Sequence, residues 1–215
     1  MTDLIDAARP AWAAALTVAF SLWGSPVTWL EIAAFVLSVA MVVCNMRVNP
    51  IGWPLAMASS LLYAMLFASS KLYGEATLQL FFIGMAVWGW WQWLRGAADG
   101  SAPLPVRSLR WPQRALATVA TLAAWPAVAL LLTHATDSDV PWADALSTTG
   151  SVTGTLMLGR KLVDNWAVWV AVNVFSVGLF AYKGLWLTVA LYAVFAVMSV
   201  LGWRAWKRQQ AAPAT

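Results

Sequence analysis

Charged residues are scarce in this sequence. Asp, Glu, Lys and Arg together make up 10% of the 215 residues, whereas a soluble domain carries about 25%. So few charged side chains cannot cover a water-facing surface, which excludes a soluble globular protein. Hydrophobic residues make up 61% of the chain. The sequence therefore predicts an integral membrane protein surrounded by a lipid bilayer.

Cysteine and histidine are nearly absent. The one cysteine, Cys44, lies inside an apolar run, which excludes a disulfide framework. The one histidine, His134, has no second metal-ligand residue at HxxxH or CxxC spacing. The sequence contains no nucleophile–base pair and no glycine-rich phosphate loop. We therefore predict that the chain is not an enzyme and has no metal or cofactor site.

Apolar segments account for most of the chain. Seven of them are candidate transmembrane helices, at residues 27–48, 51–70, 74–94, 113–133, 142–158, 165–182 and 186–206. A shorter apolar segment, 10–23, has 14 residues, which makes about 21 Å of helix against a hydrocarbon core of about 30 Å. We expect it to form a short N-terminal helix that either spans the membrane as an eighth segment or lies at its interface.

The basic residues are spread over short loops between the apolar segments. The net charge of +4 therefore does not indicate a nucleic-acid partner. When the loops alternate across the membrane, ten basic residues fall on one side, and only Lys71 and Lys183 fall on the other. The positive-inside rule places the first side, which includes the C-terminus, in the cytoplasm.

The second half of the chain repeats the first at an offset of 113 residues. When 53–95 is laid over 166–208, 14 of 43 positions are identical, and both segments end in G-W-x-x-W-x-R. Two three-helix units of the same orientation need an odd number of spans between them, and the helix at 113–133 supplies one. We therefore predict an all-α fold of 3+1+3 transmembrane helices with parallel repeats. The expected segments are an N-terminal segment (1–26), the first unit (27–95), a linker and connecting helix (96–141), the second unit (142–208) and a C-terminal tail (209–215).

Polar residues deep in the predicted helices are neutral. No formal charge lies near the middle of any of the seven segments, which favours facilitated diffusion over ion-coupled transport, because coupling requires an ionisable group at depth. Asn173 lies about 12 Å into its helix, with Ser60 as its repeat counterpart, and Gln79 lies in the third helix. These side chains either form hydrogen bonds between helices or contact a ligand.

The sixteen tryptophans have two predicted roles. Those that end their helices are expected to form an interfacial belt; they are Trp90, Trp93, Trp203 and Trp206. Trp166 and Trp169 instead share a helix face with Asn173. Two indoles at this spacing can flank a flat ring and attract a cationic one, although packing in the helix bundle would also explain them.

Several runs resemble the PnuC family of nicotinamide riboside transporters. In the second unit they are D-N-W-x-x-W at 164–169, L-F-x-Y-K-G-L at 179–185 and G-W-x-x-W at 202–206. In the first unit they are N-P-x-G-W-P at 49–54, S-L-L-Y at 60–63, K-L-Y-G at 71–74 and Gln79. The likeness covers residues 27–208.

This resemblance implies uptake of nicotinamide riboside, an NAD precursor, across the bacterial inner membrane by facilitated diffusion. A cytoplasmic kinase would then trap the riboside by phosphorylation. It also implies a homotrimer whose protomers have a fold similar to that of the SWEET sugar transporters. The W-x-x-W signature falls on Trp166 and Trp169, where the nicotinamide ring is expected. Asn173 and Gln79 are expected to contact the ribose or carboxamide, and Ser60 and Tyr63 complete the predicted substrate-binding set.

Two alternatives remain at this point. A protein of the same fold could carry thiamine or another vitamin, because thiamine is also a flat aromatic cation. The chain could also be a membrane receptor or assembly subunit that binds a ligand without moving it.

Overall fold

The described part of the chain is mostly helical, as the sequence predicts. The structure, a computed structural model, describes residues 14–22, 24–69, 73–95, 104–136, 139–184 and 186–211. Its helices are α2 (Trp29–Met46), α3 (Gly52–Ser69), α4 (Tyr73–Arg95), α5 (Trp111–Ala135), α6 (Pro141–Gly159), α7 (Asn165–Tyr182) and α8 (Trp186–Ala211). Each of the seven predicted transmembrane segments is confirmed as a helix. Within this described part, α2, α5, α7 and α8 are long and apolar enough to cross a membrane.

The N-terminal helix predicted at 10–23 is wrong from Val18 to Leu22. Residues Val18–Leu22 form strand β1, which pairs antiparallel with β2 (Ser25–Thr28). Gly24 has a φ of +85°, a conformation that suits glycine in a tight turn. The run from Val18 to Leu22 contains a β-branched and an aromatic residue, which favour a strand. Residues 10–13 and 23 of the same prediction lie outside the described residues.

Local signals explain where several helices begin. Thr28 caps α2: its hydroxyl accepts a hydrogen bond from the Glu31 amide, and the Glu31 carboxylate accepts one from the Thr28 amide. This reciprocal pair satisfies two donors that a helix start would otherwise leave unpaired. Pro141 is the first residue of α6, where its missing N–H costs nothing.

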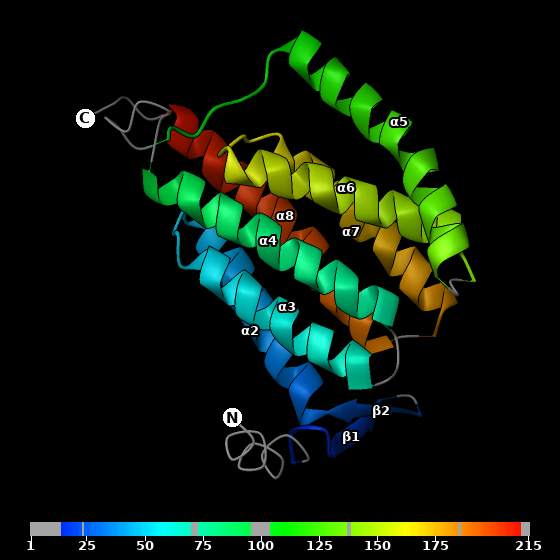
Figure 1. Ribbon diagram of the computed structural model, residues 1–215. Helices are drawn as coiled ribbons and strands as arrows, with labels where there is room; N and C mark the ends of the chain where they lie inside the picture. Colours follow the sequence, from blue (N-terminus) through cyan, green and yellow to red (C-terminus); the bar gives the residue numbers. More distant parts are fainter. Residues whose placement is uncertain are drawn as a thin grey trace.

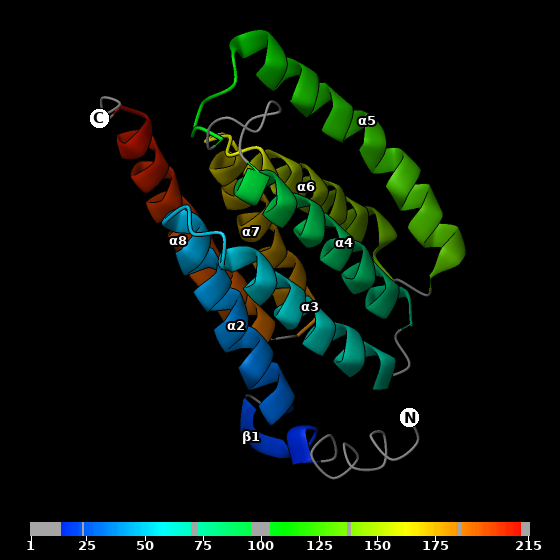
Figure 2. The same cartoon turned by 60° about the vertical axis from the view of Figure 1, so that its left-hand side comes forward.

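The helices α2 to α4 and α6 to α8 contact one another in a closed ring, which can be followed in Figures 1 and 2. In the first unit α3 packs between α2 and α4, and in the second unit α7 packs between α6 and α8. The units meet at two seams, α4 against α6 and α2 against α8. As a result α3 and α7 lie on opposite sides of the ring. Helix α5 lies outside it and packs mainly against α6 (Figure 1).

The two units repeat the same backbone detail after their first helices. Val48 has a φ of +54° and Lys161 a φ of +51°, and these residues are 113 positions apart. Non-glycine residues rarely adopt this left-handed conformation. Its recurrence at equivalent positions supports the internal duplication that the sequence indicates.

The linker before α5 is joined to the second unit. The Arg107 amide donates to the Lys161 carbonyl (3.1 Å), and the Val163 amide donates to the Arg107 carbonyl (2.8 Å). The Asp164 carboxylate accepts a hydrogen bond from the Leu109 amide at 2.7 Å. The same carboxylate forms an ion pair with Arg114, also at 2.7 Å. These contacts fix the start of α5 beside the start of α7.

Candidate functional site

One end of the ring is closed by four indoles, which we call the tryptophan cluster: Trp53, Trp93, Trp166 and Trp206. Trp53 meets Trp93 edge to face, with centroids 5.6 Å apart and planes at 89°. Trp166 meets Trp206 in the same way, at 5.5 Å and 88°. Trp93 and Trp206 also contact each other at 6.1 Å. We call this end of the ring, where α4 and α8 finish, the tryptophan end.

Glycines make room for two of these rings. A Cβ atom on Gly202 would lie 2.6 Å from the Trp166 ring, and one on Gly89 would clash with Trp53. Gly89 and Gly202 are equivalent in the two units, as are Trp53 and Trp166. The same ring-on-glycine contact therefore joins α3 to α4 and α7 to α8.

The other two indoles form hydrogen bonds across the seams. Trp93 of the first unit donates to the Leu158 carbonyl of the second at 3.1 Å, and Trp206 of the second donates to the Asn45 carbonyl of the first at 3.0 Å. Asn45 and Leu158 are themselves 113 residues apart, so the two bonds are related by the repeat. The prediction that Trp93 and Trp206 belong to an interfacial belt is wrong, because they are 5% and 0% exposed.

Trp166, predicted to stack on the substrate, belongs to the tryptophan cluster. Its side chain is 2% exposed, because Gly202 and Trp206 enclose it. Its indole N–H is buried without a hydrogen-bond partner among the described residues, and so is that of Trp53. A contact between Trp166 and a ligand stays a prediction.

Trp169 and Asn173 lie on α7, further from the tryptophan end. The Trp169 ring is half-buried and lies against Gly154 of α6, where a Cβ would be 2.9 Å from it. Asn173 is buried, and its amide nitrogen donates to the Ser199 hydroxyl of α8 at 3.1 Å. This is the interhelical hydrogen bond that the sequence left as one of two possibilities. Among the described residues, the Asn173 amide oxygen accepts no hydrogen bond.

The remaining predicted residues lie on α3 and α4. Ser60, Tyr63 and Gln79 are all half-buried. The Gln79 amide makes no hydrogen bond to any other residue that the structure describes. Tyr63 lies within electrostatic reach of Tyr192 on α8 and Glu31 on α2. This interaction links Tyr63 to a helix of the opposite unit, whereas no hydrogen bond joins Gln79 to Asn173.

An aromatic group at the other end of the ring was missed by sequence reasoning. Phe180 and Tyr192 have centroids 5.0 Å apart, and Phe195 lies 6.0 Å from Tyr192. Tyr192 is the repeat counterpart of Gln79, and this equivalence was the available signal. Beyond this group, Lys183 forms ion pairs with Asp144 (3.3 Å) and Asp139 (3.5 Å).

One buried cation lies at the tryptophan end. The Lys161 ammonium is 5.1 Å from the centroid of the Trp93 ring, within the range of a cation–π interaction. Burial lowers the pKa of Lys161, because desolvation disfavours its charged form. The repeat counterpart is Val48, so this charge is present on only one side of the pseudo-symmetric ring.

Comparison with known proteins settles the family. The family model described as "Nicotinamide mononucleotide transporter" matches residues 28–208. The chain belongs to this family. The nicotinamide riboside transporter PnuC of Escherichia coli is 27% identical to it over 170 residues, which cover 67% of this chain and 71% of that protein. The riboflavin/roseoflavin transporter RibM of Streptomyces davaonensis is 28% identical over 192 residues, which cover 87% of this chain and 89% of that protein.

A crystal structure of the vitamin B3 transporter PnuC has the same fold. It superimposes with a TM-score of 0.70 over 85% of this chain and 82% of that chain, at 22% sequence identity. Membership of the family makes the chain a multi-pass membrane transporter. It also confirms the prediction that the chain is not an enzyme.

Proposed function

We propose that the chain carries nicotinamide riboside across the bacterial inner membrane by facilitated diffusion. The observation that supports this most is the pairing of Trp169 with Asn173 on one face of α7. It presents a half-buried indole and, one turn away, an amide oxygen that accepts no hydrogen bond within the described residues. The indole face attracts a cationic aromatic ring, and the oxygen suits a donor such as the carboxamide or a ribose hydroxyl.

Gln79 supplies the second polar contact in this proposal. Its amide offers both donors and an acceptor, and a polar group held in an apolar ring gains free energy by pairing with a ligand. Ser60 and Tyr63, on α3 across the ring from α7, would contact the ribose. Trp166 would support Trp169 by fixing α7 against α8 through Gly202.

The tryptophan cluster would close the cytoplasmic end of the path. The proposed orientation follows the positive-inside rule, since Arg95, Arg160 and Arg208 all lie at the tryptophan end. Alternating access would separate the two units at that end, which breaks the hydrogen bonds of Trp93 and Trp206. Trapping by phosphorylation would keep the flux inward. A homotrimer is proposed on the family resemblance.

Riboflavin is the second candidate substrate. The relative RibM, named a riboflavin/roseoflavin transporter, matches more of this chain than the E. coli PnuC does, at a similar identity. The neutral flavin gains less from an indole face than a cationic nicotinamide ring does. We therefore place the riboside first.

Calorimetric titration tests both candidates on the detergent-purified protein. We expect binding of nicotinamide riboside and weaker or no binding of riboflavin and thiamine. Trp169→Ala is expected to reduce affinity for the riboside about tenfold, because one stacking contact contributes about 1–2 kcal/mol. Trp203→Ala, which removes an exposed indole on α8, is the matched control and should bind as the parent does.

Other results of these measurements would reject the proposed substrate, the proposed site or the proposed mode of transport. Tighter binding of riboflavin would keep the fold and replace the substrate, and unchanged affinity in folded Trp169→Ala would reject the site. Proteoliposomes separate a transporter from a receptor, because only a transporter accumulates labelled riboside to equilibrium. Dependence of that uptake on an ion gradient would contradict facilitated diffusion.

A further inference from the structure

We propose that the groove on the seam between α4 and α6 binds one acyl chain of an anionic phospholipid, whose phosphate is held by Arg160. This inference is independent of the transported substrate. It concerns the outer surface of the ring, where the protein meets the bilayer.

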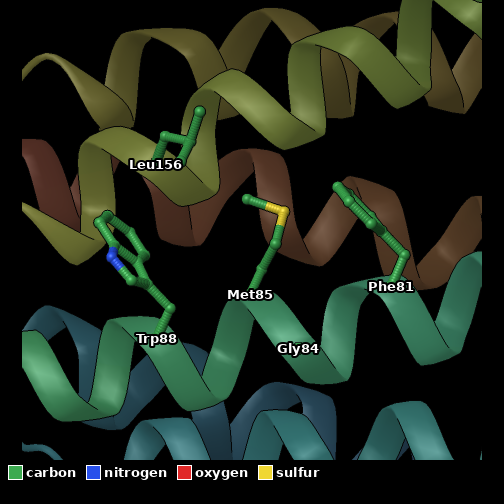
Figure 3. Close-up of a pocket in the computed structure, with 5 residues that line it drawn as sticks. All are labelled: Phe81, Gly84, Met85, Trp88 and Leu156. Carbon is green, nitrogen blue, oxygen red and sulfur yellow. The ribbon is translucent and has the colours of Figure 1, made fainter.

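The groove is almost entirely apolar. Its lining residues are Phe81, Gly84, Met85 and Trp88 of α4 and Leu156 of α6, around a volume of about 400 Å³ (Figure 3). Phe81 and Leu156 are well exposed, so the groove faces away from the protein core. From Phe81 to Trp88 it follows about 10 Å of helix, which corresponds to eight or so methylene groups of a lipid chain. The Trp88 indole N–H is the one polar side-chain group among these five, too few to pair with the backbone of a bound peptide.

Gly84 creates the space. A Cβ at Gly84 would meet no atom within 4 Å. The space at this position is therefore large enough for a side chain, but glycine leaves it open. The equivalent residue on the other seam, between α8 and α2, is Val197, which is 62% exposed. The groove is therefore a local feature of the α4–α6 seam and does not follow from the repeat.

A cation stands at one end of the groove. The Arg160 guanidinium carbon lies 5.8 Å from the centroid of the Trp88 ring, so the arginine is placed directly beside the groove lining. Arg160 is the C-cap of α6, about 6 Å beyond Leu156 along the axis. Within the described part of the chain it is exposed and forms no ion pair. Arg95, at the end of the neighbouring α4, contributes a second positive charge.

An apolar groove that ends beside Arg160 and Arg95, neither of which forms an ion pair with another described residue, has the charge pattern of an anionic lipid site. The guanidinium pairs with a phosphate through two parallel hydrogen bonds, while the acyl chain fills the space over Gly84. A zwitterionic lipid offers the same chain, but its choline group offsets the phosphate charge. Basic pockets between transmembrane helices bind anionic headgroups for this reason.

The test is native mass spectrometry of the purified protein in the presence of phosphatidylglycerol and phosphatidylcholine with identical acyl chains. We expect the parent protein to retain phosphatidylglycerol about fivefold better, which is the effect of one arginine near the headgroup. Arg160→Gln should bring the two lipids close to parity. Gly84→Leu should lower retention of both, because the leucine side chain fills the groove.

Gly178→Leu is the matched control. Gly178 is an exposed helical glycine of α7 whose Cβ would also meet nothing within 4 Å, so this variant adds the same side chain elsewhere and should retain lipid as the parent does. Equal retention of the two lipids by the parent would overturn the proposal, and so would full retention by Gly84→Leu. A change in oligomer mass in Gly84→Leu alone would assign the groove to a contact between copies of the chain and would also overturn it.

Discussion

Gly202→Val is expected to lower the midpoint of thermal unfolding by about 5 °C. The added Cβ would lie 2.6 Å from the Trp166 ring, and neither α7 nor the buried indole can retreat, because Trp206 packs on the same ring. Overpacking of this kind costs about 1–3 kcal/mol, and each kcal/mol shifts the midpoint by about 2–4 °C in a chain of this size. Gly89→Val, which pushes against Trp53, should have a similar effect.

A thermal-shift series in one detergent measures both variants. Gly178→Val is the control, because it makes the same change on α7 where no atom lies within 4 Å. Equal midpoints for Gly202→Val and Gly178→Val would show that the Trp166 ring does not rest on Gly202.

Trp206→Ala is expected to destabilise the protein more than any other single truncation. Trp206 is fully buried, contacts Trp93 and Trp166, and donates across the seam to the Asn45 carbonyl. Removing a buried tryptophan costs about 3–5 kcal/mol, so the midpoint should fall by roughly 10 °C. Trp206→Phe keeps most of the ring and removes the hydrogen bond, which should cost about 1–3 kcal/mol because the carbonyl is left unpaired.

The control for this series lies one turn away on the same helix. Trp203 is 39% exposed, and Trp203→Ala should change stability by less than about 0.5 kcal/mol. Trp93→Phe should match Trp206→Phe, since the two indoles make equivalent bonds. If Trp203→Ala proves as damaging as Trp206→Ala, the distinction between buried and exposed members of the repeated G-W-x-x-W motif is wrong.

The helices could be predicted from the sequence because their apolar runs are long and bounded by polar loops. The prediction of residues 165–182 coincides with α7. The strand β1 could not be predicted in this way, since a short apolar run has no period that separates strand from helix. There the pairing with β2 decides the structure, and pairing is a property of two segments together.

Buried and exposed tryptophans were harder to tell apart from the sequence. Trp203 and Trp206 both lie near the end of α8. Residue type alone does not show which of them faces the inside of the helix ring. The informative residue was Gly202: it is buried against Trp166 of α7, and Trp206, four residues later, lies on the same face of α8, whereas the adjacent Trp203 does not. The depth of Asn173 in its helix could be predicted, but its partner could not, because Ser199 comes from another helix.

The crossed hydrogen bonds at the tryptophan end have a consequence for the origin of the fold. Each three-helix unit donates one indole N–H to the other and accepts one in return, so neither unit alone satisfies the groups that it buries. Two copies of a single unit, facing each other about a twofold axis, would make the same exchange. Such a contact is isologous and closes after two subunits. A homodimer of half-length chains could therefore have been stable before the two halves were joined through the segment that contains α5.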